Sequence, residues 1–224
     1  MQSGLSLVAH DLHKSFDGGL VQALRGVDLA VGPGERVAVV GPTGCGKSTL
    51  LSLLALLDVP DRGEIEVDGR PSGSLRPPED WRAREVGIVF QFHHLLPHLT
   101  VEENTLLPLL ASGGRIDVRG AAGLLDRLGL TEKAQTLGAR LSGGERQLAA
   151  VARALVNEPR LVLADEPTGS VDSATGSRIL GELFDWSARG GGSLVLVTHD
   201  PAVARRMDRV VAMKDGRVVD GAAG

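Results

Sequence analysis

Short runs of consecutive apolar residues recur along the chain and are separated by longer stretches with a helical pattern. We interpret the runs as buried strands, which cover residues 37–40, 86–90, 161–164, 194–198 and 210–213. Strands that are apolar on both sides and alternate with helices are typical of a parallel sheet covered on both faces. The hydrophobic pattern therefore predicts an α/β fold with a parallel-sheet core.

Two further local patterns flank this core. Residues 50–57 form the densest apolar stretch, which predicts a buried helix because it is apolar on all sides. This stretch is too short to cross a bilayer, which requires about 20 residues. Near the end of the chain, Asp215 and Gly216 stand between two apolar runs, which predicts a β-hairpin turn.

The stretch from residue 95 to residue 159 has a helical pattern throughout. It contains two capping boxes, the side-chain pattern that marks helix starts, at Thr100/Glu103 and Ser142/Glu145. We expect Pro159 to end the last of these helices, because proline disrupts a helix interior. We interpret residues 93–159 as a helical lobe inserted into a sheet-containing lobe formed by residues 1–92 and 160–224, all within one domain.

Composition narrows the class of protein without changing this picture. The 224 residues suit one large domain, and the formal net charge of −4 does not favour a nucleic-acid partner. Cys45 is the only cysteine, so no internal disulfide can form. Residues 1–10 lack a basic segment followed by an apolar core, so we expect no secretory signal.

Residues 41–49 read GPTGCGKST and fit the pattern G-x-x-x-x-G-K-[ST] between a predicted strand and a predicted helix. The glycines allow backbone N–H groups to turn toward phosphate oxygens, and the helix that follows offers its positive N-terminus to the same anion. Lys47 is expected to reach the β- and γ-phosphates, and the Ser48 hydroxyl to bind Mg²⁺. This segment, which we call the phosphate loop, predicts a nucleoside triphosphate site.

Two adjacent carboxylates follow the buried strand at residues 161–164. Ligands of open α/β sheets bind at the carboxyl ends of the strands, where Asp165 and Glu166 stand. Asp165 is placed to hold Mg²⁺ through water, and Glu166 to orient or deprotonate an attacking water molecule. The pair therefore predicts hydrolysis at the phosphate loop.

A second glycine-rich segment, LSGGE at residues 141–145, precedes another predicted helix. Ser142, Gly143 and Gly144 turn a hydroxyl, backbone N–H groups and the positive end of the helix toward one side. The segment therefore predicts a second anion-binding position, far from the phosphate loop in sequence.

This segment resembles the signature of ABC-type ATPases, and the other elements of that family occur in the family's order along the whole chain. The resemblance implies the P-loop NTPase fold of an ABC nucleotide-binding domain, with a parallel-sheet core, an antiparallel β part and an inserted helical lobe. It also implies ATP hydrolysis coupled to transport. Two copies are expected to pair head-to-tail, so that each ATP lies between the phosphate loop of one copy and the signature of the other.

The resemblance implies roles for individual residues as well. Phe16 matches the aromatic residue that stacks on adenine, and Gln91 the glutamine that senses Mg²⁺ and couples to the membrane partner. Asp172 ends the loop that communicates across the dimer, and His199 contacts the γ-phosphate. The implied catalytic residues are Lys47, Gln91, Glu166 and His199; the implied Mg²⁺ ligands are Ser48, Gln91 and Asp165; the implied ATP-binding residues are Phe16, Gly41, Pro42, Thr43, Gly44, Cys45, Gly46, Lys47, Ser48, Thr49, Ser142, Gly143, Gly144 and Asp172.

The segments FHHLLP (residues 92–97) and ARALVNEPRLVLADEPTG (residues 152–169) are similar to the lipoprotein-releasing ATP-binding subunits. That group stands beside macrolide-exporter and cell-division ATPases. The resemblance implies integral-membrane permease partners with a large extracytoplasmic domain. It also implies a peripheral position on the cytoplasmic face of the inner membrane.

Several alternatives remain open because the chain departs from the lipoprotein-releasing pattern at Leu148, at residues 170–171 and at residues 137–140. One is a regulatory ATPase that controls cell-wall hydrolysis at division, and another is an exporter ATPase for haem, peptides or antibiotics. A soluble ABC ATPase acting on DNA or ribosomes, or a phosphate-loop kinase, agrees less well with the motifs. His93, His94 and His98 lack cysteine or carboxylate partners at ligand spacing, so we expect a surface or interface role rather than a metal site.

Overall fold

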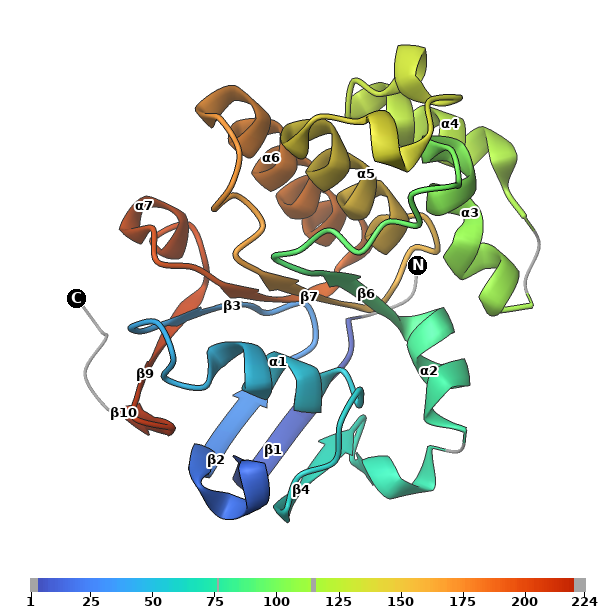
Figure 1. Ribbon diagram of the computed structural model, residues 1–224. Coiled ribbons are helices and arrows are strands. Elements are labelled where there is room, and N and C mark those ends of the chain that lie inside the picture. Colours follow the sequence, from blue (N-terminus) through green and yellow to red (C-terminus); the bar gives the residue numbers. More distant parts are fainter. Residues whose placement is uncertain (1–3, 76, 114–115, 220–224) are drawn as a thin grey trace.

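The computed structural model describes residues 4–75, 77–113 and 116–219. Its centre is a six-stranded sheet in the order β10-β9-β3-β8-β7-β6 (Figure 1). Neighbouring strands run parallel except for β10, which is antiparallel to β9. The strands are β3 (Arg36–Val40), β6 (Val86–Val89), β7 (Leu161–Asp165), β8 (Ser193–Val197), β9 (Arg209–Lys214) and β10 (Arg217–Val219). The predicted parallel-sheet core is confirmed.

A second, antiparallel sheet lies below the first in Figure 1, in the order β2-β1-β4-β5. Its strands are β1 (Leu7–Phe16), β2 (Val21–Val31), β4 (Arg62–Val67) and β5 (Arg70–Pro71). Helix α1 (Lys47–Leu54) lies between the two sheets, and its leucines share one buried cluster with residues of both. Alternate residues of β3, β7 and β8 face this cluster, as the two-residue period of a strand requires.

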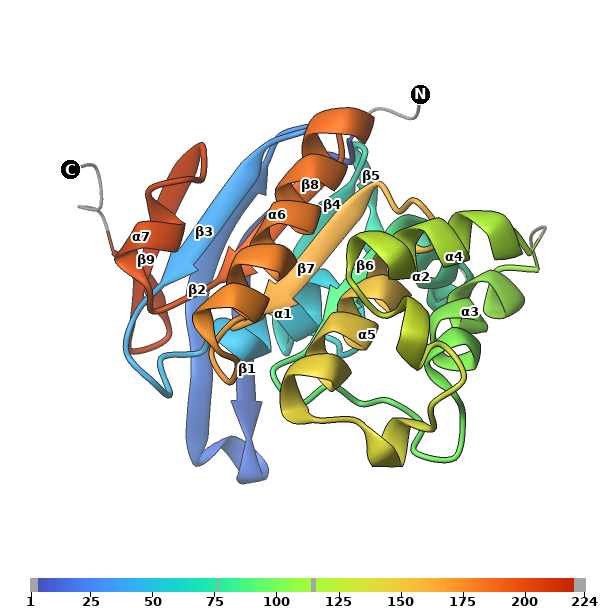
Figure 2. The ribbon, with the colours of Figure 1, turned by 90° about the horizontal axis from the view of Figure 1, so that it is seen from above.

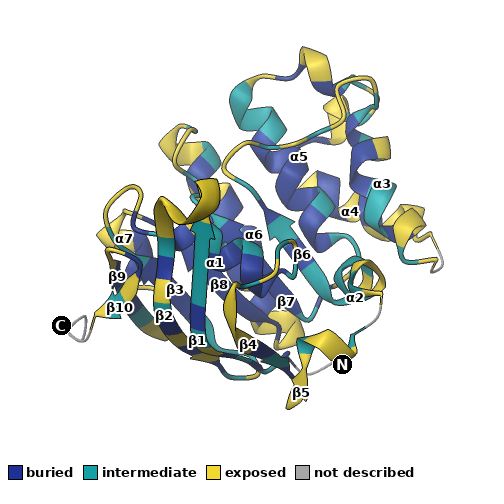
Figure 3. Cartoon of the chain, turned by 60° about the horizontal axis from the view of Figure 1, so that its bottom comes forward, coloured by how far each residue is buried: buried dark blue, intermediate teal, exposed yellow. Residues whose placement is uncertain are grey.

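The other face of the six-stranded sheet is covered by α5 (Gly143–Leu155) and α6 (Ser173–Gly190) (Figure 2). Inward residues of α5 are fully buried, and the dark core runs continuously from this helix through the sheet (Figure 3). Helices α1 and α5 therefore lie on opposite faces of the same sheet, a relationship that separates the two predicted anion-binding positions within one copy.

A helical region connects β6 to β7 in the chain, and the capping boxes at its helix starts are present as predicted. Thr100 accepts from the backbone of Glu103 and Ser142 from that of Glu145, each with the reciprocal bond. The remaining helices are α2 (Pro78–Glu85), α3 (Val101–Ala111), α4 (Val118–Arg127) and α7 (Pro201–Ala204), with 3₁₀ turns at Asp17–Gly19, Ser72–Ser74, Thr131–Lys133 and Gly138–Arg140. No helix within the described ranges has the length and apolar character needed to span a bilayer.

Two predicted element ends were wrong, and the hairpin was right. Helix α1 ends at Leu54 rather than at residue 57, because Leu56 adopts a left-handed φ of 52° that no α-helix can continue. Pro159 does not end α5, which stops at Leu155; it lies in the loop before β7. Asp215 and Gly216 both have positive φ (49° and 77°) between the antiparallel strands β9 and β10, as a type I′ turn requires.

Candidate functional site

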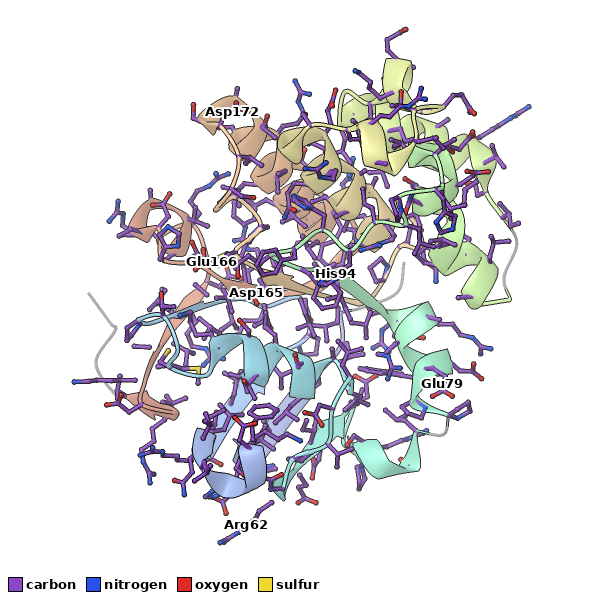
Figure 4. The ribbon with its side chains drawn as sticks, viewed as in Figure 1. Arg62, Glu79, His94, Asp165, Glu166 and Asp172 are labelled. Atoms are coloured by element: carbon purple, nitrogen blue, oxygen red, sulfur yellow. The ribbon has the colours of Figure 1, made fainter. Side chains whose placement is uncertain are left out.

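The sheet order brings four of the predicted functional segments to one edge. The phosphate loop follows β3, His199 follows β8, Asp165 and Glu166 end β7 and begin the next loop, and Gln91 follows β6. These four strands are consecutive neighbours and run parallel, so their carboxyl ends meet at the same side of the sheet. Figure 4 shows Asp165 and Glu166 together at this edge.

Two positions of the phosphate loop, Gly41 and Gly46, have no room for a side chain. Gly46 has a φ of 104°, and a Cβ atom there would lie 2.4 Å from the carbonyl oxygen of Ala23 in β2. A Cβ at Gly41 would lie 2.2 Å from the carbonyl oxygen of Met213 in β9. The loop is thus packed between neighbouring strands, which fixes the direction of its backbone N–H groups.

Lys47, the first residue of α1, folds its side chain back over the phosphate loop. Its Nζ atom donates to the carbonyl oxygens of Gly41 at 2.7 Å and Pro42 at 2.9 Å, and the residue is only 9% exposed. The Cys45 thiol, 3.9 Å from Nζ, is buried beneath the loop, whereas Thr43 and Gly44 are exposed. The loop therefore holds one buried cation beside exposed backbone, which suits an anionic ligand.

Oxygen atoms from two elements meet beside Lys47. The Ser48 hydroxyl in α1 hydrogen-bonds to the Asp165 carboxylate at the end of β7. The pKa of Asp165 is raised, mainly because the carboxyl group is buried and also because the negative charge of Glu166 is near. The hydrogen bond from Ser48 and the positive charge of Lys47 oppose this shift. A hydroxyl and a carboxylate in contact, with the Gln91 amide on the adjacent strand end, are the oxygen donors that Mg²⁺ prefers. The residues present therefore fit Mg²⁺.

Glu166 and His199 form a close side-chain pair at this edge. Nδ1 of His199 lies 2.7 Å from Oε2 of Glu166, and the histidine side chain is 72% exposed whereas that of Glu166 is 16% exposed. Glu166 adopts a left-handed φ of 47°, a conformation that is strained for a residue with a Cβ atom. The Glu166 N–H donates to the carbonyl oxygen of Val197 in β8 at 3.1 Å, which holds this conformation in place.

The signature segment stands apart from this edge, at the N-terminus of α5. Gly143 and Gly144 form the first turn, and Ser142 caps the helix by accepting from the Glu145 N–H at 3.3 Å. Helix α5 packs against the face of the sheet opposite α1, so the helix that Ser142 caps and the helix that follows the phosphate loop lie on different faces of the sheet.

The other predicted residues lie on separate elements. Phe16 ends β1 in the antiparallel sheet, is 42% exposed, and has Nζ of Lys14 at 5.6 Å from its ring centre. Asp172 caps α6, with Oδ1 accepting from Ala174 and Thr175. Hydrogen bonds from Thr175 hold the pKa of Asp172 below its usual range. Gln91 is exposed beyond the end of β6.

Three contacts of α5 were not predicted from the sequence. Gln147, 1% exposed, donates from Nε2 to the carbonyl oxygen of Pro167, directly after Glu166. Arg153 donates to the carbonyl oxygens of His94 at 2.6 Å and His93 at 2.9 Å. The His93 ring lies against the backbone of Gly143, with Nε2 buried and unpaired, and burial lowers the pKa of this ring. Helix α5 thus joins the signature to both the Glu166 loop and the segment after Gln91.

Histidines 93, 94 and 98 do not gather with other ligand types. Among the residues that the structure describes, no group of three or more histidine, cysteine, aspartate or glutamate side chains is arranged to hold a metal ion. His93 is half-buried and His94 and His98 are exposed. The expected surface or interface role of these residues stays a prediction.

Comparison with known proteins extends these observations over nearly the whole chain. The family model described as "ABC transporter" matches residues 24–169. The "Lipoprotein-releasing system ATP-binding protein LolD" of Ruegeria pomeroyi is 50% identical over 205 residues, which cover 89% of this chain and 90% of that protein. A protein with the same description from Legionella pneumophila is 43% identical over 217 residues, which cover 94% and 95%.

A solved structure is similar over the same extent. It is the ATP-binding cassette MJ0796, described as a dimer in a post-hydrolysis state bound to ADP and Pi. Its TM-score is 0.89 at 36% sequence identity, over 95% of this chain and 96% of that chain.

Proposed function

Because the chain belongs to the ABC transporter family and is an ATP-binding, ATP-hydrolysing subunit of that family, we propose that it powers lipoprotein release by a separate membrane permease. The observation that carries the finer assignment is the identity of 42–50% to proteins described as lipoprotein-releasing, over nearly the full length of both chains. The segment FHHLLP at residues 92–97, which follows Gln91, supports the same branch.

In this proposal, ATP binds with its phosphates in the phosphate loop. Backbone N–H groups of residues 41–49 and the N-terminus of α1 surround the β- and γ-phosphates. Lys47 exchanges its bonds to the neutral Gly41 and Pro42 carbonyls for bonds to phosphate oxygens, which pair its buried charge with an anion. Phe16 offers its half-exposed ring to the adenine base.

Ser48, Asp165 and Gln91 would hold the Mg²⁺ that accompanies ATP. The ion, when bound, neutralises charge that develops on the phosphate oxygens. The burial of Asp165 suits this role, because a carboxylate that is costly to ionise in the folded protein gains most from a neighbouring cation.

Glu166 takes the proton of the attacking water, and His199 orients Glu166 while its exposed ring contacts the γ-phosphate. The 2.7 Å contact between the two side chains supports this division, since a general base acts only in a fixed geometry. The strained backbone of Glu166 aims its carboxylate at the strand edge rather than along β7.

Two copies of the chain share each ATP. Helix α1, which follows the phosphate loop, and helix α5, which Ser142 caps, lie on opposite faces of the sheet in one copy. A second copy therefore supplies Ser142, Gly143 and Gly144 to the γ-phosphate. Asp172, at the N-terminus of α6, lies in the loop that follows the Glu166 segment and contacts the partner copy.

The coupling to transport runs through the inserted helices. Residues 93–159 act as a helical lobe against the sheet-containing lobe of residues 1–92 and 160–224, and Gln91 joins the two. Segment 92–97, with Phe92 73% exposed, contacts a cytoplasmic helix of a permease that carries a large extracytoplasmic domain. The chain then works at the cytoplasmic face of the inner membrane.

Depletion of the chain from its bacterial host tests the cargo. We expect lipoproteins to accumulate in the inner-membrane fraction, and a phosphate-loop variant, Lys47→Ala, to fail to restore their release. Filamentous cells with a normal lipoprotein distribution would instead favour the cell-division regulator. Normal division and normal lipoprotein distribution would favour an exporter of haem, peptides or antibiotics.

A further inference from the structure

Gln147, in the second turn of α5, is a buried polar side chain that reaches the loop behind the proposed general base. The residue is 1% exposed, and its Nε2 atom donates to the carbonyl oxygen of Pro167 at 3.0 Å. Pro167 directly follows Glu166 in the chain. A single hydrogen bond therefore joins the helix that Ser142 caps to the backbone beside Glu166.

The backbone around Glu166 is held from two sides. The N–H of Glu166 donates to the carbonyl oxygen of Val197 in β8, and the carbonyl oxygen of the next residue, Pro167, accepts from Gln147. Between these two bonds Glu166 adopts its left-handed φ of 47°. A strained conformation of this kind persists only where its surroundings impose it. Gln147 therefore helps to fix the direction in which the Glu166 carboxylate points.

The first turn of α5 lies against the far end of the same loop. A Cβ atom added to Gly144 would lie 3.5 Å from Cγ2 of Thr175, in the first turn of α6. The Thr175 hydroxyl donates to Oδ2 of Asp172 at 2.7 Å. Figure 4 shows Glu166 at the sheet edge and Asp172 at the start of α6. A shift of α5 therefore acts on both ends of the loop between these two residues.

The Gln147 amide is not explained by packing. Its Oε1 atom is buried and has no hydrogen-bond partner among the residues that the structure describes. Burial of an unpaired polar atom costs free energy, and an apolar side chain of similar volume would avoid that cost. The contact with the Pro167 carbonyl is the feature of this side chain that an apolar residue could not supply.

We propose that Gln147 is a positioning residue through which the signature of one copy holds Glu166 of the same copy in place. The inference rests on the part of the proposed function in which two copies share each ATP. The signature of a copy then contacts ATP held by its partner, whereas Glu166 acts on ATP in its own phosphate loop. Closure of the signature on the partner's ATP places α5, and the hydrogen bond to Pro167 passes that placement to Glu166.

A substitution in only one copy of a mixed dimer tests this role. Gln147→Met keeps the length of the side chain and removes its donor. An active copy is mixed with a large excess of a Glu166→Gln copy before Mg-ATP is added, so that nearly every active copy has an inactive partner. Gln147→Met is placed either in the active copy, in cis, or in the inactive partner, in trans. The rate of the first turnover is then measured by rapid quenching.

The first turnover should be about tenfold slower with Gln147→Met in cis than in trans, because a small misplacement of a catalytic group has a large effect on rate. A residue that only shaped the signature would act in trans, since the active site uses the signature of the partner. A general loss of stability would act from either copy. Gln135→Met, which removes an exposed glutamine before the signature, is the matched control and should show no difference between cis and trans.

The outcomes separate the inference from the proposed function. Equal rates in cis and in trans, or a slower rate in trans, would overturn the positioning role and leave the shared site standing. A Glu166→Gln copy that stays monomeric with Mg-ATP in light scattering would overturn both. Gln147→Leu, a second variant without a donor, should give the same excess in cis. If neither variant folds by circular dichroism, Gln147 serves the stability of the fold and the inference is wrong.

Discussion

Nδ1 of His199 lies 2.7 Å from Oε2 of Glu166, and the two residues reach this contact from the ends of adjacent parallel strands, β8 and β7. The carboxylate is largely buried while the ring is exposed, so the ring covers the carboxylate on its solvent side. The contact therefore joins Glu166, which we propose deprotonates water, to His199, which we propose contacts the γ-phosphate.

Replacement of the proposed general base separates binding from hydrolysis. Glu166→Gln should reduce ATP turnover by about 10²–10⁴-fold, the usual contribution of general acid–base catalysis, while ATP affinity stays within about threefold. Turnover is measured by phosphate release and affinity by calorimetry. Retention of full turnover would show that Glu166 does not take the proton.

The Glu166–His199 contact predicts a non-additive pair. His199→Ala should slow turnover, and the double variant should be about as slow as Glu166→Gln alone, because residues that act as a unit do not contribute independently. His10→Ala, an exposed histidine on β1, is the control and should not change turnover. If the fold-reduction in turnover of the double variant equals the product of the two single reductions, the contact has no catalytic role.

Lys47 carries the buried charge of the phosphate loop. Lys47→Ala should weaken ATP binding by about ten- to a hundredfold, because hydrogen bonds to charged groups contribute about 1.5–3 kcal/mol each. Lys214→Ala removes an exposed lysine of β9 as the matched control. If calorimetry gives Lys47→Ala the same ATP affinity as Lys214→Ala, the phosphate loop does not bind the ATP phosphates through Lys47.

An ion pair between Arg36 in β3 and Asp208, the residue before β9, makes the stability of the fold sensitive to acid. Hydrogen bonds from Arg36, including one of 2.6 Å to Oδ1, hold the pKa of Asp208 below its usual range. The folded state therefore binds this proton less readily than the unfolded state. The resulting stability is present above the unfolded pKa of about 3.9 and is lost as the pH falls through the folded pKa.

Asp208→Asn tests this element. Asp208 is 43% exposed, so the pair contributes less than about 1 kcal/mol, and Tm at pH 7 should fall by less than about 4 °C. The difference from the parent chain should shrink as the pH is lowered below about 4. The exposed Asp185→Asn is the control, and a difference that is constant with pH contradicts the assignment.

Local sequence patterns predicted what depends on near neighbours. The capping boxes, the Asp215–Gly216 turn and the strand–loop–helix around Lys47 each rest on residues close in the chain, and the structure contains all three. The end of α1 was mispredicted because Leu54 and Leu56 are equally apolar. The hydrophobic pattern cannot tell a leucine inside the helix, such as Leu54, from Leu56, which lies in the following turn with a left-handed φ.

Contacts between distant segments could not be predicted in this way. Gln147 reaches Pro167 and Arg153 reaches the carbonyls of His93 and His94 only because α5 packs beside β6 and β7. Backbone carbonyls carry no side-chain signal, so a residue that binds them leaves no pattern in the sequence. The meeting of Ser48 with Asp165 was expected, because the phosphate-loop motif and the carboxylates at the end of the 161–164 strand each predicted a Mg²⁺ ligand.

The sharing of ATP between two copies is tested most directly by mixing two variants that are defective in different halves of the site. Both carry Glu166→Gln; one adds Lys47→Ala and the other adds Ser142→Arg. We predict that neither forms a dimer with Mg-ATP by size-exclusion chromatography with light scattering, whereas the equimolar mixture does, because the mixed dimer keeps one complete site. A mixture that stays monomeric, or a Ser142→Arg variant that dimerises by itself as well as Glu166→Gln alone, would contradict the shared site.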